Sequence, residues 1–445
     1  MSIVVRFAPS PTGYLQAGNG RAAALNFLLA RKDGGQFLLR IDDTDDTRSK
    51  PEFEEAILED MGWLGINHDL FARQSERVPL YVNATEKLKA AGLLYPCYET
   101  ATELERKRRR LLSQGKPPIY DRAAMALSEG DRARFESEGR KPHWRFKLSH
   151  KPIVWDDRVR GRTEIDTSSL SDPVLVREDG RFLYTLPSVV DDIDFRITHV
   201  FRGEDHVTNT APQIEIFEAL GASRPAFAHY PLFVARGGEK LSKREGSLSL
   251  KALRDSGVES LALATYVAKI GTSDPIDPHF SLDTLAAEFS FEKIGRAPAH
   301  FDLAELEALT AKTLHAMPFA LAAGRLAALG IGGSESFWEM ARANLDKFDD
   351  IKELWRVVSG PVTPVLEDAP LATQALAALP EEPWDETTWG VWTRDVSAKT
   401  GLSGRALFHP LRLAITGSDH GPELRKLLPL IGRAKVEARL KGEAA

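Results

Sequence analysis

The first hundred residues alternate short apolar runs with helical patterns, each bounded by turn residues. Residues 3–7 form a β-branched run that stops at Pro9, and residues 22–30 are rich in helix formers. The same patterns predict, in order, a strand over 36–41, a helix beginning near Pro51, a helix over 80–91 and a strand over 94–98. This alternation is typical of a parallel sheet covered by helices.

The pattern changes near residue 102, which indicates an insertion. Thr102 and Glu105 have the spacing of a capping box, and the residues that follow, up to Lys141, are charged and helix-prone. Residues 144–185 are β-like, and Asp179-Gly180 predicts a tight hairpin turn between the strands VLVRE and RFLYTL. We therefore expect an α+β insertion within the α/β domain.

After the insertion the alternation of strands and helices resumes. A strand over 197–201, a helix that stops at Gly221 and a strand-like run over 226–234 complete it. From Leu250 onward the chain is predicted to be almost entirely helical, with loops near residues 275–278, 332–333, 361–364 and 380–383.

Length and composition indicate a multidomain globular protein. The chain has 445 residues, 43% apolar and 27% charged, which suggests about two to four domains. No apolar run approaches the length of a membrane span, and the N-terminus lacks the pattern of a secretion signal, so we expect no membrane association and a cytoplasmic location. Cys97 is the single cysteine, which excludes an intramolecular disulfide and a multi-cysteine zinc site.

The net charge of −6 argues against generalised nucleic-acid binding. Lysine and arginine nevertheless cluster at residues 106–110, 140–162 and 425–441. Taken alone, such clusters are more often solvated surfaces than binding sites.

Two loops have the composition of phosphate-binding segments. Residues 6–21, RFAPSPTGYLQAGNGR, join a strand to a helix N-terminus, where free N–H groups suit phosphate, although the spacing is neither that of a dinucleotide fingerprint nor that of a P-loop. Residues 235–247, ARGGEKLSKREGS, carry three cations between glycines and could neutralise a polyphosphate. A solvated surface turn is the alternative for the second loop.

A third set of residues is acidic or polar. Asp42 and Arg202 follow or end expected strands, and ligands of open α/β sheets bind at that edge. Arg202 could clamp a carboxylate in a bidentate pair. The set also contains Tyr184, Ser188 and the pair Asp191-Asp192, although each of these residues taken singly is more often a cap or an ion-pair partner.

Together these motifs are far more specific than each one alone. RFAPSPTG, QAGN, RIDDTD, VVDD, RGEDH and LSKR, in this order, resemble the bacterial glutamyl-tRNA synthetases. The similarity extends to FDLAELEALT near Phe301 and to ALFHPLRLAITG near the C-terminus, and so covers essentially the whole chain.

The resemblance implies an α/β Rossmann-like catalytic domain with an α+β insertion, followed by all-α stem-contact and anticodon-binding domains. It assigns residues 1–98 and 173–249 to two catalytic halves, 99–172 to an insertion that binds the tRNA acceptor end, 250–318 to stem contact and 319–445 to anticodon binding. The implied reaction is adenylation of L-glutamate by ATP with Mg²⁺, followed by transfer to the 3′ end of tRNA(Glu). The implied enzyme is a monomer, with tRNA(Gln) left open as a second partner.

The family motifs also imply site residues. The residues implied to bind glutamate are Arg6, Ala8, Ser10, Asp42, Tyr184, Ser188 and Arg202. Those implied to bind ATP are Pro9, Ser10, Thr12, Gly13, Gln16, Gly18, Asn19, His206, Ser242 and Lys243. Those implied to act in catalysis are Gln16, Asn19, Lys240, Lys243 and Arg244.

Three departures from the family pattern affect this interpretation. Gln16-Ala17 replaces the usual His and Ile or Val of the signature loop, which predicts slower activation rather than inactivity. Asp42 and Ser188 replace the commoner Glu and Asn of the amino-acid pocket, which makes strict glutamate specificity less secure. Cys97-Tyr98-Glu99 stands where many members begin a zinc cluster with Cys-x-Cys, so neither zinc nor another protein-held metal is expected.

Three alternatives remain open at this stage. A non-catalytic or regulatory tRNA-binding paralogue would explain the altered signature loop, but the retained KLSKR motif weighs against it. A truncated paralogue that modifies a tRNA base would lack the long helical C-terminus, and a glutaminyl-tRNA synthetase would carry β-barrel anticodon domains.

Trp384, Trp389 and Trp392 could stack on unpaired bases but are more typical of a helical core.

Overall fold

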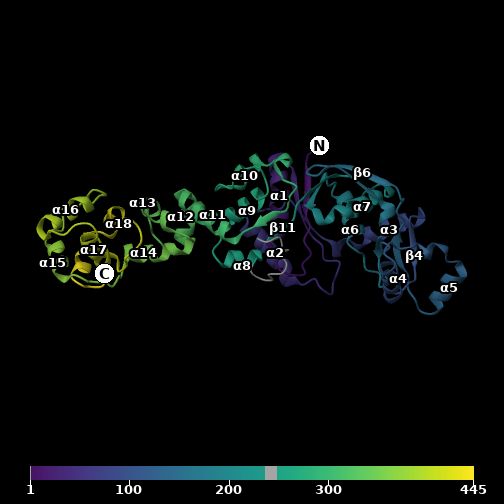
Figure 1. Ribbon diagram of the computed structural model, residues 1–445, viewed down its shortest axis with the longest axis horizontal. Helices are drawn as coiled ribbons and strands as arrows, with labels where there is room; N and C mark the ends of the chain where they lie inside the picture. The colour runs from purple at the N-terminus through teal and green to yellow at the C-terminus, as the bar shows by residue number, and fades with distance from the viewer. Residues whose placement is uncertain (1, 236–247) are drawn as a thin grey trace. The chain divides into compact units, whose positions relative to one another are not determined.

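The computed structural model describes residues 2–235 and 248–445 (Figure 1). The chain divides into two compact units. The first comprises Met1–Ser256 and Leu263–Asp302, and the second comprises Gly257–Ala262 and Leu303–Ala445.

A parallel sheet forms the centre of the first unit. Strands β1 (Val4–Phe7), β2 (Gln36–Ile41) and β3 (Leu70–Arg73) pair in parallel, as do β9 (His199–Gly203) and β10 (Ala226–Tyr230). The N–H of Thr198 donates to the Val4 carbonyl at 2.9 Å, which puts β9 beside β1. The order of strands along the sheet therefore reverses between β1 and β9, and open α/β sheets bind their ligands at such a point.

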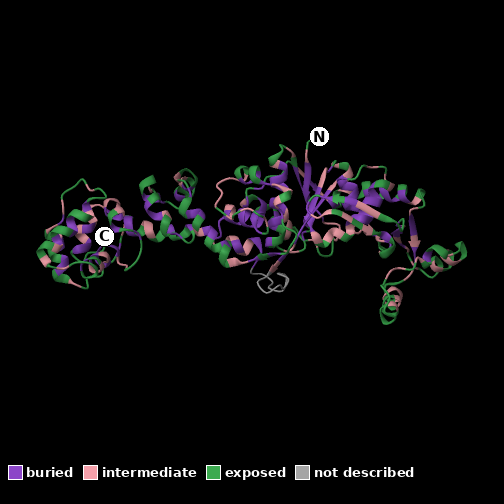
Figure 2. Cartoon of the chain, turned by 45° about the horizontal axis from the view of Figure 1, so that its top comes forward, coloured by how far each residue is buried: buried purple, intermediate pink, exposed green. Residues whose placement is uncertain are grey.

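Helices cover this sheet on both faces, which explains the nearly continuous apolar runs of its strands. All four residues of β1 and five of the six residues of β2 are buried, and these strands form the purple centre of the first unit in Figure 2. The covering helices are α1 (Ala17–Lys32), α2 (Pro51–Trp63), α3 (Val78–Ala90), α6 (Thr185–Asp194) and α7 (Val207–Ala219).

The inserted segment is mixed α and β, as predicted. Strands β4 (Leu94–Cys97), β5 (His143–Phe146) and β8 (Val174–Val176) form one antiparallel sheet, and β6 (Pro152–Asp157) pairs with β7 (Gly161–Asp166) in a hairpin. Helices α4 (Ala101–Ser113) and α5 (Glu129–Ser137) contain no buried residue and are largely green in Figure 2.

Three local predictions for this segment were wrong. Strand β4 does not join the parallel sheet but pairs antiparallel with β5, because its apolar side chains pack with the inserted strands. The capping box of α4 is formed by Thr100 and Glu103, two residues earlier than predicted. The turn at Gly180 is present, with φ +86°, but of the expected second strand only Phe182 forms a bridge before α6 begins.

The remainder of the first unit packs around a second parallel pair. Strand β11 (Phe233–Ala235) pairs with β12 (Ala299–Phe301), a strand that the helical prediction missed because it has only three residues. Among the described residues between these strands, three α-helices form: α8 (Leu250–Asp255), α9 (Ser260–Lys269) and α10 (Leu282–Glu288).

The second unit is helical over its described residues. Its helices are α11 (Leu303–Ala316), α12 (Phe319–Ala328), α13 (Glu335–Ala341), α14 (Ile351–Ser359), α15 (Ala369–Ala377), α16 (Thr388–Thr400), α17 (Arg405–Thr416), α18 (Leu424–Ile431) and α19 (Arg433–Leu440). Trp392 is fully buried, with its indole N–H donating to the Ala375 carbonyl at 2.9 Å, whereas Trp384 and Trp389 are half-buried. The predicted fold class is confirmed.

Within the described part of the chain, no helix is both long enough and apolar enough to span a bilayer.

Candidate functional site

A cavity of about 410 Å³ opens where β1 and β9 end and α1 begins. This is the edge of the sheet at which the strand order reverses, so its position follows from the topology. Ten of the residues predicted from the sequence line the cavity: Arg6, Ala8, Pro9, Ser10, Gly18, Asn19, Asp42, Tyr184, Arg202 and His206.

Arg202 is the most constrained cation of this cavity. Its Nε donates to His229 Nε2 at 3.1 Å and its Nη1 to the Tyr184 hydroxyl at 3.1 Å. Its Nη2 donates to the His206 carbonyl at 3.2 Å and to Thr210 Oγ1 at 2.8 Å. Arg202 is only 7% exposed, yet no carboxylate of the described residues forms an ion pair with it. A buried guanidinium held only by neutral groups is suited to an anionic ligand.

The electrostatic effect of Arg202 extends to its neighbours. Burial alone would raise the pKa of the Tyr184 phenol, but the guanidinium groups of Arg202 and Arg6 outweigh burial and lower this pKa. Burial and Arg202 also lower the pKa of His206. This end of the cavity is therefore strongly positive.

Asp42 supplies the opposite charge. Its carboxylate accepts from Arg40 Nε at 2.6 Å and from Arg40 Nη2 at 3.0 Å. Burial nevertheless raises the pKa of Asp42 to about 6, against the effect of Arg40. The group is ionised at neutral pH and could accept hydrogen bonds from an ammonium group in the cavity.

The two aspartates of the VVDD motif, Asp191 and Asp192, form buried ion pairs. Asp192 pairs with Arg6 at 3.1 Å and with Arg40 at 3.2 Å. Asp191 pairs with Arg77 at 2.7 Å and lies 3.7 Å from Arg40. Unlike Asp42, these paired and buried carboxylates do not line the cavity, so they orient the cations around it and do not bind a ligand directly.

The N-terminus of α1 forms the other end of the cavity. Gly18 and Asn19 line it, and a Cβ at Gly18 would meet no atom within 4 Å, so the backbone is open to a ligand. The Oδ1 of Asn19 accepts from the N–H of Gln16 at 2.9 Å and fixes the first turn. The positive end of the helix dipole makes this end suitable for phosphate.

The start of α1 is tied to the chain just beyond residues 236–247. The N–H of Ala17 donates to the Leu248 carbonyl at 3.0 Å, and the N–H of Leu250 donates to the Leu15 carbonyl at 2.8 Å. Leu248 and Leu250 therefore join the chain to the first of the two segments that the sequence singled out for phosphate binding.

The remaining predicted residues lie elsewhere. Ser188 is fully buried outside the cavity lining, where its Oγ accepts from Arg40 Nη2 at 3.3 Å. Thr12, Gly13 and Gln16 do not line the cavity, and the Gln16 side chain donates to the Tyr14 carbonyl at 3.2 Å. Lys240, Ser242, Lys243 and Arg244 lie outside the described residues.

Sequence reasoning gave no site role to five polar residues in or beside the cavity, namely Arg21, Asn26, Arg40, Asp205 and Tyr230. Arg21 is 1% exposed and donates to the carbonyls of Pro231 and Ile270, each at 3.0 Å, while burial lowers its pKa to about 10. Asp205 and Tyr230 also line the cavity. Arg40 lies behind the lining and forms an ion pair with Asp42. The available signal was a charged residue within a buried apolar run, as in the β2 sequence QFLLRI.

The described residues contain no group of three His, Cys, Asp or Glu side chains arranged to hold a metal ion. Cys97 is buried, and burial raises the pKa of its thiol to about 11. The Tyr120 hydroxyl lies 3.7 Å from Cys97 Sγ and donates to Glu99 Oε1 at 2.9 Å. These contacts involve Cys97 Sγ and Glu99 Oε1.

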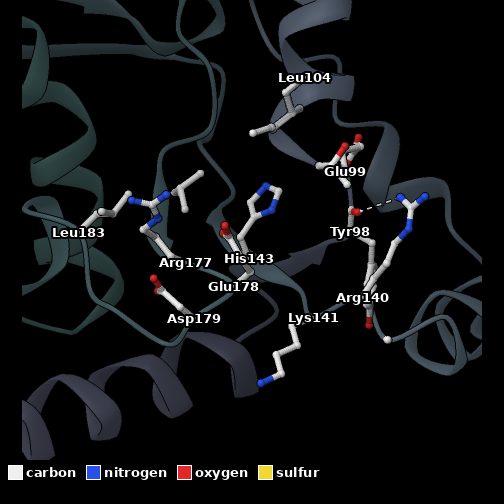
Figure 3. Close-up of a pocket in the computed structure, with 14 residues that line it drawn as sticks. Tyr98, Glu99, Leu104, Arg140, Lys141, His143, Arg177, Glu178, Asp179 and Leu183 are labelled. Atoms are coloured by element: carbon white, nitrogen blue, oxygen red, sulfur yellow. Dashed lines mark hydrogen bonds between the residues drawn. The ribbon is translucent and has the colours of Figure 1, made fainter. Parts of the chain in front are cut away.

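A second cavity, of about 670 Å³, lies in the inserted segment. Figure 3 shows the His143 ring between Arg177 on one side and Glu99 and Tyr98 on the other. His143 is 6% exposed, and its Nε2 and the Oε2 of Glu99 are both buried without a hydrogen-bond partner among the described residues. Buried polar atoms of native proteins are normally satisfied, so this pair suits a ligand with a polar edge.

The chain is similar to known proteins over its whole length. Residues 2–308 match the family model "tRNA synthetases class I (E and Q), catalytic domain", and residues 363–443 match "Anticodon binding domain". The chain is 58% identical over 447 residues to glutamate–tRNA ligase 2 of Methylobacterium sp. (strain 4-46), with 100% of each chain covered. It is 58% identical over 441 residues to glutamate–tRNA ligase 1 of Parvibaculum lavamentivorans, covering 99% of this chain and 98% of that one.

A solved structure shares the architecture. The crystal structure of a glutamate tRNA ligase from Elizabethkingia meningosepticum, in complex with its amino acid, matches with a TM-score of 0.85 and 27% identity. The match covers 99% of both chains.

Proposed function

The chain belongs to the class I tRNA synthetases (E and Q), and from this premise we propose that it is a glutamate–tRNA ligase. It activates L-glutamate with ATP and transfers the glutamyl group to the 3′ end of tRNA(Glu). The observation that carries the proposal is Arg202, a buried cation without an acidic partner among the described residues, in the cavity at the start of α1. The full-length relatives named glutamate–tRNA ligase support it, and no comparison supports a non-catalytic paralogue.

The chemistry requires no protein nucleophile. An oxygen of the substrate α-carboxylate attacks the α-phosphorus of ATP, and diphosphate leaves. A ribose hydroxyl of the terminal adenosine of tRNA then attacks the glutamyl carbonyl, and AMP leaves. The protein contributes positioning and stabilisation of the developing charge.

We assign one substrate to each end of the cavity. We assign the side-chain carboxylate of glutamate to Arg202 and its ammonium group to Asp42, with Arg6, Ala8, Ser10 and Tyr184 around them. Ser188 acts from behind, because it contacts Arg40 and not the cavity. Shape and charge both favour a substrate with one cationic and one anionic end.

ATP occupies the end formed by the helix N-terminus. The residues assigned to it are Pro9, Ser10, Thr12, Gly13, Gln16, Gly18, Asn19 and His206, together with Lys240, Ser242, Lys243 and Arg244 from the second loop. Mg²⁺ would enter with ATP and would supply positive charge beside its phosphates.

The tRNA contacts fall in the inserted segment and the second unit. The cavity around His143 and Glu99 suits an unpaired nucleotide of the acceptor end, since a base with an amino group and a ring acceptor could satisfy both orphaned atoms. Residues 99–172 would hold the acceptor end, 250–318 the stem and 319–445 the anticodon. We propose a cytoplasmic monomer and leave tRNA(Gln) as a second partner to be tested.

Incorporation of labelled glutamate into tRNA tests the function. We expect ATP-dependent charging of tRNA(Glu) transcripts, with tRNA(Gln) transcripts assayed beside them. Binding of tRNA without charging of either transcript at high enzyme concentration would refute the ligase and favour a binding protein.

A further inference from the structure

A buried pair of side chains lies behind Arg202, on the side away from the cavity. His229 of β10 and Asp157 at the end of β6 both have side chains that are 0% exposed. His229 Nδ1 lies 2.5 Å from Asp157 Oδ2, and His229 Nε2 accepts from Arg202 Nε at 3.1 Å. The three side chains form a continuous chain of hydrogen bonds from the inserted hairpin to the cavity.

The chemistry of the partners decides which imidazole nitrogen carries the proton. Arg202 can only donate, so His229 Nε2 must be an acceptor, and an ionised Asp157 can only accept, so Nδ1 must carry the hydrogen. Burial lowers the pKa of His229, which keeps the ring neutral. Although burial opposes its ionisation, the hydrogen bond from His229 and two backbone N–H groups hold the pKa of Asp157 below its ordinary value.

Asp157 is itself rigidly fixed by the backbone. Its Oδ1 accepts from the N–H groups of Val159 at 3.1 Å, Arg160 at 3.0 Å and His229 at 3.1 Å. The N–H of Arg158 also donates to the Phe227 carbonyl at 2.9 Å, which joins the tip of the β6–β7 hairpin to β10. The carboxylate therefore has one position relative to His229.

An arginine has five N–H donors, and four acceptors surround Arg202. Among the described residues this leaves one Nη1 hydrogen, on the nitrogen that contacts Tyr184 at the cavity wall. The direction of this donor depends on the rotation of the guanidinium plane. All four acceptors fix that rotation, and His229 does so at Nε, where its Nε2 also lies 3.2 Å from Thr210 Oγ1.

We propose that Asp157 and His229 are positioning residues for Arg202, which select the imidazole tautomer that holds the guanidinium in the orientation needed to bind a substrate carboxylate. The inserted hairpin thereby contributes to amino-acid selection, although it does not line the cavity. The inference rests on the proposed function, because it takes the ligand of Arg202 to be the side-chain carboxylate of glutamate.

The first test compares Asp157→Asn with the matched neighbour Asp156→Asn, whose side chain is exposed. In Asp157→Asn the new amide donates to Nδ1, so the ring hydrogen moves to Nε2 and opposes the Arg202 donor. We expect KM for glutamate to rise about tenfold, with kcat and KM for ATP changed less than about twofold, in diphosphate exchange with tRNA present. The preference for glutamate over glutamine should fall by a similar factor, because the glutamine side chain has no carboxylate and its binding does not depend on such a contact with Arg202. The Asp156→Asn variant should match the wild type.

The second test uses two variants of His229 that separate its two contacts. His229→Asn retains a donor near Asp157 but is too short to accept from Arg202, and should raise KM for glutamate about tenfold. His229→Gln places a carbonyl oxygen within reach of Arg202 and should stay within about twofold of the wild type. If Asp157→Asn does not fold, these two variants still test whether His229 positions Arg202.

The outcomes separate this inference from the proposed function. The inference is overturned if all four variants have the same KM for glutamate. It is also overturned if kcat falls and the KM values for glutamate and ATP rise by the same factor, because Asp157 and His229 would then have only a structural role. If the wild type itself fails to activate glutamate, the proposed function is what falls.

Discussion

The two cavities of the first unit differ in how their charged groups are held, although each lining has buried polar atoms without a partner among the described residues, namely Arg21 Nε and Asn26 Oδ1 in the cavity at α1. In the cavity at α1, Arg202 already makes four hydrogen bonds and Asp42 accepts two hydrogen bonds from the Arg40 guanidinium. In the inserted cavity, His143 Nε2 and Glu99 Oε2 have no partner among the described residues, and the rim at Arg177 and Glu178 is exposed. The first cavity is preorganised for a small substrate whose reacting atoms must be fixed, whereas the second is completed only by its ligand.

The largest effect should come from removing the central cation of the preorganised cavity. Arg202→Ala leaves the substrate carboxylate without its charged partner, and we expect kcat/KM for glutamate to fall about a thousandfold. Arg48→Ala is the control, because Arg48 is 71% exposed and pairs only with a surface aspartate. A loss of less than about tenfold in Arg202→Ala would remove Arg202 from the glutamate site.

The acidic side of the same cavity should make glutamate binding depend on pH. Asp42 has its pKa raised to about 6, so it gains a proton as the pH falls from 7 to 5 and loses the charge that attracts the ammonium group. We expect KM for glutamate to rise about tenfold over this range in the wild type. Asp42→Asn should show a high KM that is flat with pH, and Asp43→Asn should keep the wild-type profile. A wild-type KM that is constant between pH 7 and 5 would contradict the role of Asp42.

The two halves of this site differ in how far the sequence predicts them. Asp42 and Arg202 were predicted at the cavity because they follow or end strands in a parallel α/β pattern, and the sheet topology brings such ends together, whereas Tyr184 was implied only by the family motifs. Their partners were not predictable in the same way. His229 and Asp157 lie 72 positions apart in the sequence and meet only because an inserted hairpin packs on β10.

The sequence also did not predict which polar side chains are buried. VVDD looked like a pair of candidate ligands, but Asp191 and Asp192 point into the protein and pair with Arg77, Arg6 and Arg40. Ser188 faces the same buried cations. A helical period of apolar residues predicts a buried face but does not say which polar neighbours turn toward it.

The incomplete cavity gives a smaller, more specific prediction. His143→Asn shortens the side chain that would meet an unpaired base, and we expect KM for tRNA to rise about tenfold with KM for glutamate unchanged. The control is His150→Asn, since His150 is exposed on the same segment with φ +56°, a conformation that asparagine tolerates. An equal KM for tRNA in the two variants would leave the cavity around His143 without a role in RNA binding.

The smallest effect should come from the altered signature loop at the phosphate end of the preorganised cavity. Gln16 stands exposed at the start of α1, and its side chain donates only to the Tyr14 carbonyl among the described residues. Gln16→His would supply a donor that can carry charge, and a well-placed transition-state donor contributes ~3 kcal/mol. The positive end of the helix dipole disfavours a protonated histidine at this position, which reduces the gain. We therefore expect the rate of adenylate formation, measured in a single turnover with tRNA bound, to rise only about twofold to fivefold. An unchanged or lower rate would show that the preorganised cavity has adapted to glutamine.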